Sequence, residues 1–163
     1  MRSLRIISAG PAGPSPAPAF SLLELVLVMA ILAVVSAIAM PRMAQASARY
    51  RVETAARRVA ADLNLARTKA LSASTSQSVV FTLSPAGYRL VGLADIDHPA
   101  QEYQVSLSAQ PYTCELLQAG FAGSTSVLFD GYGRPNSGGT IELRCGGWNK
   151  ILTLEASGEV SGL

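Results

Sequence analysis

The chain has little of the side-chain chemistry on which enzymes and metal sites depend. It holds a single histidine, His98, and two cysteines that lie far apart, Cys114 and Cys145. A nucleophile and its general base are hard to assemble from this set. The sequence also lacks a phosphate loop, a His-Glu-x-x-His zinc signature and a Cys-x-x-Cys pair. It therefore predicts a protein that is not an enzyme, with no catalytic residues, cofactor or metal ion.

The one segment that invites a metal site surrounds the histidine, in Asp95-Ile96-Asp97-His98-Pro99. Calcium takes about six to eight oxygen ligands. No second set of acidic or carbonyl ligands stands at a suitable spacing. A solvated acidic turn ahead of a proline is the favoured interpretation.

Charged residues are also scarce, at 15%, and they are unevenly distributed. Residues 42–72 carry seven basic side chains against two acids, whereas residues 73–163 carry four against eight. The acidic C-terminal part argues against nucleic acid as a partner, because DNA binding depends on Lys and Arg that neutralise phosphates. The basic segment suits contact with anionic membrane lipid.

One apolar run, residues 20–40, is long enough to cross a membrane. As a helix it would extend about 31 Å, close to the thickness of a hydrocarbon core. Glu24 lies inside this run, where a carboxylate costs about 2.5–3.5 kcal/mol unless a positive group offsets it. Residues 14–19 form a proline-rich extended linker before the run. A cut between Ala19 and Phe20 would place a new amino terminus four residues from Glu24.

The residues around the Ala19–Phe20 bond resemble a sequence motif of a known protein family. The segment Ala19-Phe20-Ser21-Leu22-Leu23-Glu24-Leu25 resembles the processing site of type IV prepilins and type II secretion pseudopilins. That family has a small residue before the cut, Phe after it, Glu five residues into the mature chain, and a helix-loosening proline where Pro41 falls. This chain departs from the usual glycine before the cut, and its leader is longer and richer in proline.

The resemblance implies a set of processing and assembly steps. Prepilin peptidase would cleave between Ala19 and Phe20, and the new Phe20 amine would be methylated. Glu24 would offset a terminal amine, and Pro41 would let the helix bend. The partners would be other pilin or pseudopilin subunits and an inner-membrane assembly platform.

Pattern and resemblance together divide the chain into four segments: a leader (1–19), a transmembrane and assembly half-helix (20–40), an amphipathic half-helix (41–75) and an antiparallel β head (76–163). In the third segment, small apolar residues recur at steps of four and three, which predicts a helix that ends near residues 72–76. They are Val52, Ala56, Val59, Leu63, Ala66 and Ala70. Two i,i+4 ion pairs, Glu53–Arg57 and Arg58–Asp62, are expected on other faces of this helix.

From residue 78 the apolar period changes to two, which predicts strands. The candidates are residues 79–83, 88–93, 103–107, 112–117, 127–129, 140–145 and 151–155, with 84–87 as the turn of a first hairpin. The predicted fold class is α+β, a long N-terminal helix packed on an antiparallel sheet domain, as in pilins.

The order of elements narrows the resemblance to the GspH/FimT class of minor pseudopilins and minor pilins. Phe129 precedes a Gly-Arg-Pro turn, and the last strands end in Gly158-Glu159-Val160. FimT-type DNA-uptake pilins are basic near the C-terminus, whereas residues 156–163 hold no Arg or Lys. We therefore expect a minor pseudopilin of a type II secretion system, anchored in the inner membrane with its head in the periplasm.

Two alternatives stay open. One is a type IV minor pilin of FimT type, involved in DNA uptake or pilus initiation. The other is an exported β domain whose conventional signal peptide is cut after Ala39, although the apolar run exceeds the usual 7–15 residues of such peptides. The positive-inside rule, which counts more Arg after the run than before it, would by itself place the head in the cytoplasm. The pilin resemblance implies the opposite orientation.

The two cysteines and the single tryptophan each allow two interpretations. In an exported domain, Cys114 and Cys145 would form a disulfide worth about 3–4 kcal/mol; in another compartment they would be buried free thiols. Trp148, in the segment Gly146-Gly147-Trp148-Asn149, is either part of a partner surface or a partly buried aromatic in a turn.

Overall fold

The structure is a computed structural model that describes residues 21–95 and 98–162; the side chains of Met40 and Pro41 are not described. By their internal contacts, the residues form two compact units that divide between Ala39 and Met40. The helix α1 (Leu22–Ala73) contributes to both units. Ala19 and Phe20, the residues of the expected cleavage site, lie outside the described residues.

The described part of the first unit consists of the N-terminal half of α1. Every residue from Leu22 to Ala39 is exposed. By length and composition this helix could cross a membrane, and none of its most apolar stretch is buried against the protein. A helix that is apolar all round is stable when a membrane or other helices cover it. Its large exposed apolar side chains are Leu22, Leu23, Leu25, Val26, Leu27, Val28, Met29, Ile31, Leu32, Val34, Val35 and Ile38.

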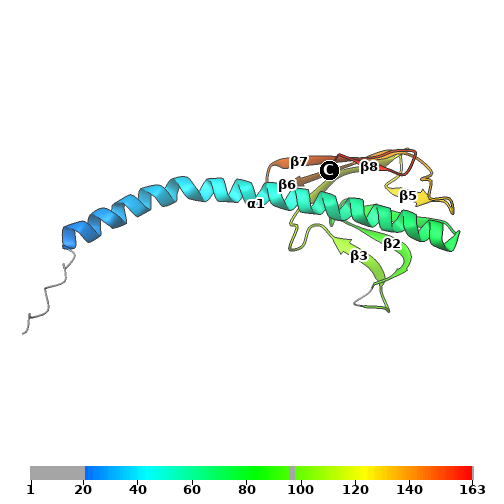
Figure 1. The fold of residues 1–163 in the computed structure, drawn as a ribbon, viewed down its shortest axis with the longest axis horizontal. Helices are drawn as coiled ribbons and strands as arrows, with labels where there is room; N and C mark the ends of the chain where they lie inside the picture. Colours follow the sequence, from blue (N-terminus) through cyan, green and yellow to red (C-terminus); the bar gives the residue numbers. More distant parts are fainter. Residues whose placement is uncertain (1–20, 96–97, 163) are drawn as a thin grey trace, which may run out of the picture. The chain divides into compact units, whose positions relative to one another are not determined.

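The second unit contains two antiparallel sheets of four strands each (Figure 1). The first has the order β3-β2-β1-β5 and the second the order β4-β6-β7-β8. The strands are β1 (Gln77–Thr82), β2 (Gly87–Ala94), β3 (Glu102–Ser106), β4 (Glu115–Phe121), β5 (Ser126–Phe129), β6 (Gly139–Cys145), β7 (Trp148–Leu154) and β8 (Val160–Ser161).

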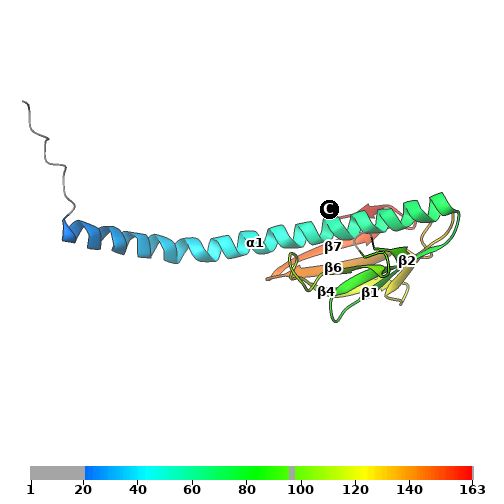
Figure 2. The same ribbon diagram turned by 90° about the horizontal axis from the view of Figure 1, so that it is seen from below.

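The C-terminal half of α1 packs on both sheets. In the view of Figure 1, β6, β7 and β8 appear above this half of the helix and β2 and β3 appear below it. The view in Figure 2 shows β1, β2, β4 and β6 together on one side of the helix. The apolar stripe predicted from the sequence is confirmed, since all six of its residues are buried in the core. Its alanines allow a close approach of the helix to the large side chains of the sheets.

The expected fold class is confirmed, as a long helix followed by an antiparallel β domain. The helix ends at Ala73, inside the predicted range. The first hairpin also forms as expected, with β1 and β2 paired from Val79↔Leu90 to Thr82↔Gly87.

The strand expected at residues 112–117 begins three residues later, at Glu115. The backbone N–H groups of Tyr112 and Thr113 both donate to the carbonyl of Ala109. Thr113 has a φ of 49°, in the left-handed region that a strand does not use. Alternation of apolar and polar residues does not distinguish such a turn from the start of a strand.

The turn between β6 and β7 is shorter than the sequence suggested. Gly146 and Gly147 have φ values of 53° and 90°, and Cys145 pairs directly with Trp148. Two residues of positive φ are what a tight hairpin of right-handed twist requires, and glycine adopts them without strain. Trp148 is therefore the first residue of β7 rather than a residue of the turn.

Candidate functional site

Glu24 lies in the first turn of α1, three residues after Ser21, which caps the helix. Its backbone N–H donates a 3.1 Å hydrogen bond to Oγ of Ser21. Ser at the cap with Glu three residues later is the sequence of a capping box, and an acid in the first turn is favoured by the helix dipole. Glu24 is exposed. Its carboxylate is thus available to a positive group outside the described residues.

The three remaining residues of the predicted site, Pro41, Cys114 and Cys145, fall in different places. Helix α1 continues through Pro41; the loosening expected at this proline stays a prediction. A disulfide joins Cys114 and Cys145, with a Cα–Cα distance of 4.5 Å. Both cysteines are buried, and they connect the residue before β4 to the last residue of β6.

His98 begins a turn, because the backbone N–H of Gln101 donates to its carbonyl oxygen. The backbone N–H of His98 donates to Oδ1 of Asp95 at 3.2 Å, while Asp97 lies outside the described residues. Within residues 21–95 and 98–162, no three side chains of the metal-ligating types gather in one place.

A groove lies between α1 and β7 in the second unit, and the sequence did not predict it. Its volume is about 720 Å³. We call it the cationic groove, because four of its side chains are basic and one is acidic. It is lined by Arg42, Gln45, Ala46, Arg49, Tyr50, Glu53, Arg57, Trp148 and Lys150.

The side chains of the cationic groove are held by contacts between helix and strand. The guanidinium of Arg49 lies 5.7 Å from the centre of the Trp148 ring, a cation–π distance. Lys150 Nζ is 3.1 Å from Oε2 of Glu53, and Arg57 Nη2 is 3.3 Å from Oε1 of the same carboxylate. One acid is therefore shared between two of the four cations.

Electrostatics keep this acid ionised. The hydrogen bond from Lys150, opposed by some burial and assisted by the charges of Lys150 and Arg57, lowers the pKa of Glu53. The groove then has four formal positive charges and one negative charge, a balance of +3. Such a surface attracts anions.

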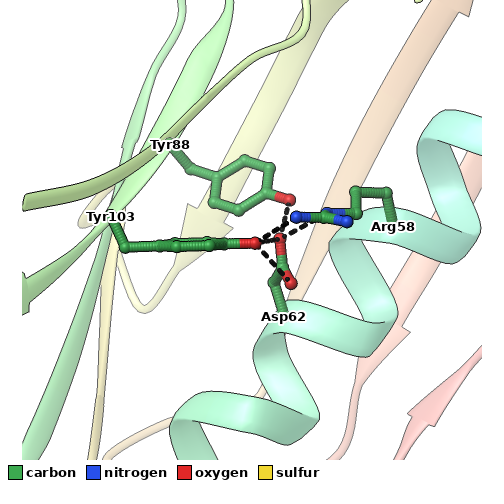
Figure 3. Close-up of polar contacts among 4 residues, drawn as sticks. All are labelled: Arg58, Asp62, Tyr88 and Tyr103. Atoms are coloured by element: carbon green, nitrogen blue, oxygen red, sulfur yellow. Dashed lines mark hydrogen bonds and ion pairs between the residues drawn. The ribbon is translucent and has the colours of Figure 1, made fainter. Parts of the chain in front are cut away.

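A second polar cluster lies in the core and joins α1 to the first sheet (Figure 3). Among the residues the structure describes, Asp62 is the only buried charged residue. Its Oδ2 accepts a hydrogen bond of 2.5 Å from the hydroxyl of Tyr88, and the hydroxyl of Tyr103 lies 3.0 Å from both carboxylate oxygens. Arg58 Nε completes the set at 3.1 Å from Oδ2, and its guanidinium also donates to Tyr103.

The sequence predicted an ordinary i,i+4 ion pair between Arg58 and Asp62, and this prediction was incomplete. The pair forms, but Asp62 is buried under β2 and β3, where two tyrosines complete its hydrogen bonds. Burial, with the neighbouring Asp62 charge, raises the pKa of both Tyr88 and Tyr103. The phenols therefore stay protonated and act as donors. Only the pairing of distant strands shows this role, because the helix and the tyrosines are far apart in sequence.

Comparison with known proteins decides the family. The family model described as "Type II transport protein GspH" matches residues 55–158, more than half of the 163-residue chain. The chain belongs to the GspH family. The matched region covers the second unit from the middle of its helix to the turn before β8, and so includes the Asp62 cluster and the disulfide.

A solved structure of a minor pilin shows the same fold. A crystal structure of the type IV minor pilin FimU from Pseudomonas aeruginosa matches with a TM-score of 0.53 and 18% identity, over 71% of this chain and 90% of that chain. FimU in a second crystal form matches at 18% identity over 67% and 90%, with a TM-score of 0.49. No curated protein sequence matches this chain. As a GspH-family protein of pilin-like fold, the chain is a structural subunit of the minor pilin and pseudopilin type and not an enzyme.

Proposed function

We propose that this GspH-family protein is a minor pseudopilin of a type II secretion pseudopilus. Prepilin peptidase cleaves it between Ala19 and Phe20, and the amine of Phe20 is methylated. Residues 20–40 hold the subunit in the inner membrane, with the second unit in the periplasm. From there the subunit is assembled into a short filament by packing its helix against those of other pseudopilins.

The observation that supports this proposal is an apolar helix that no other described part of the chain covers. The core of the second unit is complete without it, because every buried apolar residue of the described chain lies between Ala48 and Leu154. Residues 22–39 are exposed throughout. A surface of this kind must be covered by lipid or by other subunits, which is what an assembling membrane subunit needs.

Glu24 gives this helix its register. After cleavage the amine of Phe20 would lie one helical turn from Glu24, and a carboxylate in an apolar setting binds a positive group strongly. An amine of the same subunit or of the neighbouring one is the available cation. A pair between Glu24 and the amine of the neighbouring subunit would fix the axial distance between successive subunits in the filament.

Mass spectrometry of the mature protein tests the processing. The chain is purified from membranes, and its intact mass and N-terminal residue are determined. We expect a chain that begins at Phe20 and carries one additional methyl group. A chain that begins at Met40 would show a conventional signal peptide and would end the assembly proposal.

Substitutions at the cap separate charge pairing from helix capping. Glu24→Gln retains a side chain suited to the capping box but removes the charge, whereas Ser21→Ala removes the cap hydrogen bond and retains the charge. We expect Glu24→Gln to insert in the membrane but to assemble poorly, as Glu24→Ala should, and Ser21→Ala to assemble. If Glu24→Gln assembles normally, charge pairing is wrong.

The fold similarity to FimU favours one second candidate, a minor pilin of a type IV pilus. Deletion of the gene distinguishes the two systems. We expect loss of type II protein secretion with surface pili retained. Loss of pili with normal secretion would assign the protein to the pilus instead.

A further inference from the structure

We propose that the cationic groove binds the headgroup of an anionic phospholipid from the membrane that residues 20–40 enter. The inference rests on the proposed function in one respect, that the apolar helix spans a bilayer. It goes further by naming a folded lipid site, made by α1 and β7 together.

The groove has the chemistry that a phosphate recognises. Its volume of about 720 Å³ falls in the range of small-ligand sites. Among the described residues, Glu53 is the acid that Lys150 and Arg57 contact, and neither Arg42 nor Arg49 has an acidic partner. These two arginines are exposed. Guanidinium groups bind phosphate oxygens through paired hydrogen bonds, so Arg42 and Arg49 suit a phosphodiester.

The aromatic residues suit the membrane interface. Trp148 remains 42% exposed although it begins a central strand, and Tyr50 is 73% exposed. Trp and Tyr are enriched where hydrocarbon meets headgroups, because one side of each ring is apolar and one atom forms hydrogen bonds. The cation–π contact with Trp148 also holds Arg49 in place before any lipid binds.

Chain length keeps the groove near the bilayer surface. Arg42 follows Ala39 by three residues, which can span at most about 11 Å in any conformation. The headgroup layer extends about 5–7 Å beyond the hydrocarbon on each side. Arg49 is seven residues further along α1, which is two turns and therefore on the same face of the helix. Arg42 thus reaches phosphates of the near leaflet. Arg49 lies about 10 Å further along the helix and reaches the same phosphates through its long side chain, because helical side chains lean towards the N-terminus.

Charge outside the groove disfavours nucleic acid as the occupant. Outside the groove, residues 40–163 carry nine acids against seven basic residues, so the rest of the second unit would repel a polyanion that extends past the groove. A single headgroup does not extend that far. The contact would hold the subunit at a fixed depth in the bilayer until it is extracted into the filament.

The single tryptophan makes the site directly measurable, because Trp148 is the only one in the chain. The full-length protein is placed in nanodiscs that hold one copy each, made of phosphatidylcholine alone or of equal parts phosphatidylcholine and phosphatidylglycerol. Quenching of Trp148 by acrylamide, a neutral molecule, is compared in the two. We expect clear protection by phosphatidylglycerol, and loss of that protection in concentrated salt.

Matched variants locate the effect. Arg42→Gln with Arg49→Gln should weaken headgroup binding about five-fold per cation removed, and so abolish most of the protection. The control, Arg89→Gln with Arg134→Gln, removes the same charge from exposed positions elsewhere on the second unit. This control should retain the protection of Trp148 by phosphatidylglycerol. Arg49 contacts the indole, so its substitution can itself change the quenching of Trp148. For each variant, quenching is therefore compared between the two lipid compositions.

Three results would overturn the inference. Equal quenching in both lipid compositions would show that the groove holds no headgroup. Equal loss of protection in the two double variants would show that the protection depends on the net charge of the protein and not on the groove. Protection by a short DNA duplex in phosphatidylcholine nanodiscs, equal to that by phosphatidylglycerol, would make nucleic acid the occupant. Failure of the protein to enter nanodiscs at all would contradict the proposed function itself.

Discussion

The hydroxyl of Tyr88, on β2, donates a hydrogen bond of 2.5 Å to the carboxylate of Asp62, on α1. This contact lies in the core of the second unit, and Tyr103 of β3 adds a second hydroxyl to the same carboxylate. A buried charge is tolerated when its hydrogen bonds are complete. The position of the helix on the first sheet is therefore set by a polar contact as well as by apolar packing.

Removal of the Tyr88 hydroxyl should destabilise the second unit. Tyr88→Phe retains the ring, whose centre lies 5.5 Å from that of Phe81, and removes only the donor. A hydrogen bond to a buried charge contributes about 1.5–3 kcal/mol, so we expect a loss of that size in urea unfolding. Tyr132→Phe, at an exposed residue, is the control and should change stability by less than about 0.5 kcal/mol. Equal effects of the two changes would contradict this role of Asp62.

Stability should also fall at alkaline pH. Burial, together with the charge of Asp62, raises the pKa of Tyr88, so the folded protein keeps this phenol protonated. In the unfolded chain the phenol ionises near pH 10. The contribution of Tyr88 is thus complete below about pH 10 and is lost as the pH rises towards its folded pKa. Urea midpoints measured on either side of pH 10 should drop less in Tyr88→Phe than in the native chain; an identical drop would exclude Tyr88 as a cause.

Loss of the disulfide should weaken the second sheet. The bond between Cys114 and Cys145 closes a loop with a sequence separation of 31 residues. For a loop of this length the chain-entropy model gives about 3–4 kcal/mol. Thermal unfolding with and without a reductant measures the difference, and Cys114→Ser with Cys145→Ser should match the reduced protein. A melting temperature unaffected by reductant would show that the bond is absent in solution.

Two glycines on the paired strands β4 and β6 should differ in their tolerance of a methyl group. A Cβ at Gly139 would collide with the carbonyl of Gly120 and the ring of Phe121, whereas one at Gly120 would meet only the end of the Gln118 side chain, at 3.2 Å. We expect Gly139→Ala to destabilise by about 1–3 kcal/mol and Gly120→Ala to be close to neutral. Urea unfolding compares them, and equal losses would mean that strand pairing adjusts freely.

The sequence by itself determined the elements whose signal is local. The period of 3.6 in the stripe from Val52 to Ala70 predicted which face of the helix is buried, because neighbouring turns alone define that face. The change to a period of two predicted an antiparallel β domain. The apolar run and Glu24 likewise stand out in the sequence, because a membrane-length segment needs no tertiary contact to be recognised.

The tertiary structure decided the features that join distant segments. It placed Asp62 beneath Tyr88 and Tyr103, although an i,i+4 partner had suggested an ordinary ion pair. It also brought Trp148 to Arg49, about a hundred positions earlier in the chain. Contacts of this kind depend on strand order and register, which local periodicity does not encode. The helix face could therefore be predicted from the sequence, whereas the cationic groove and the buried carboxylate required the fold.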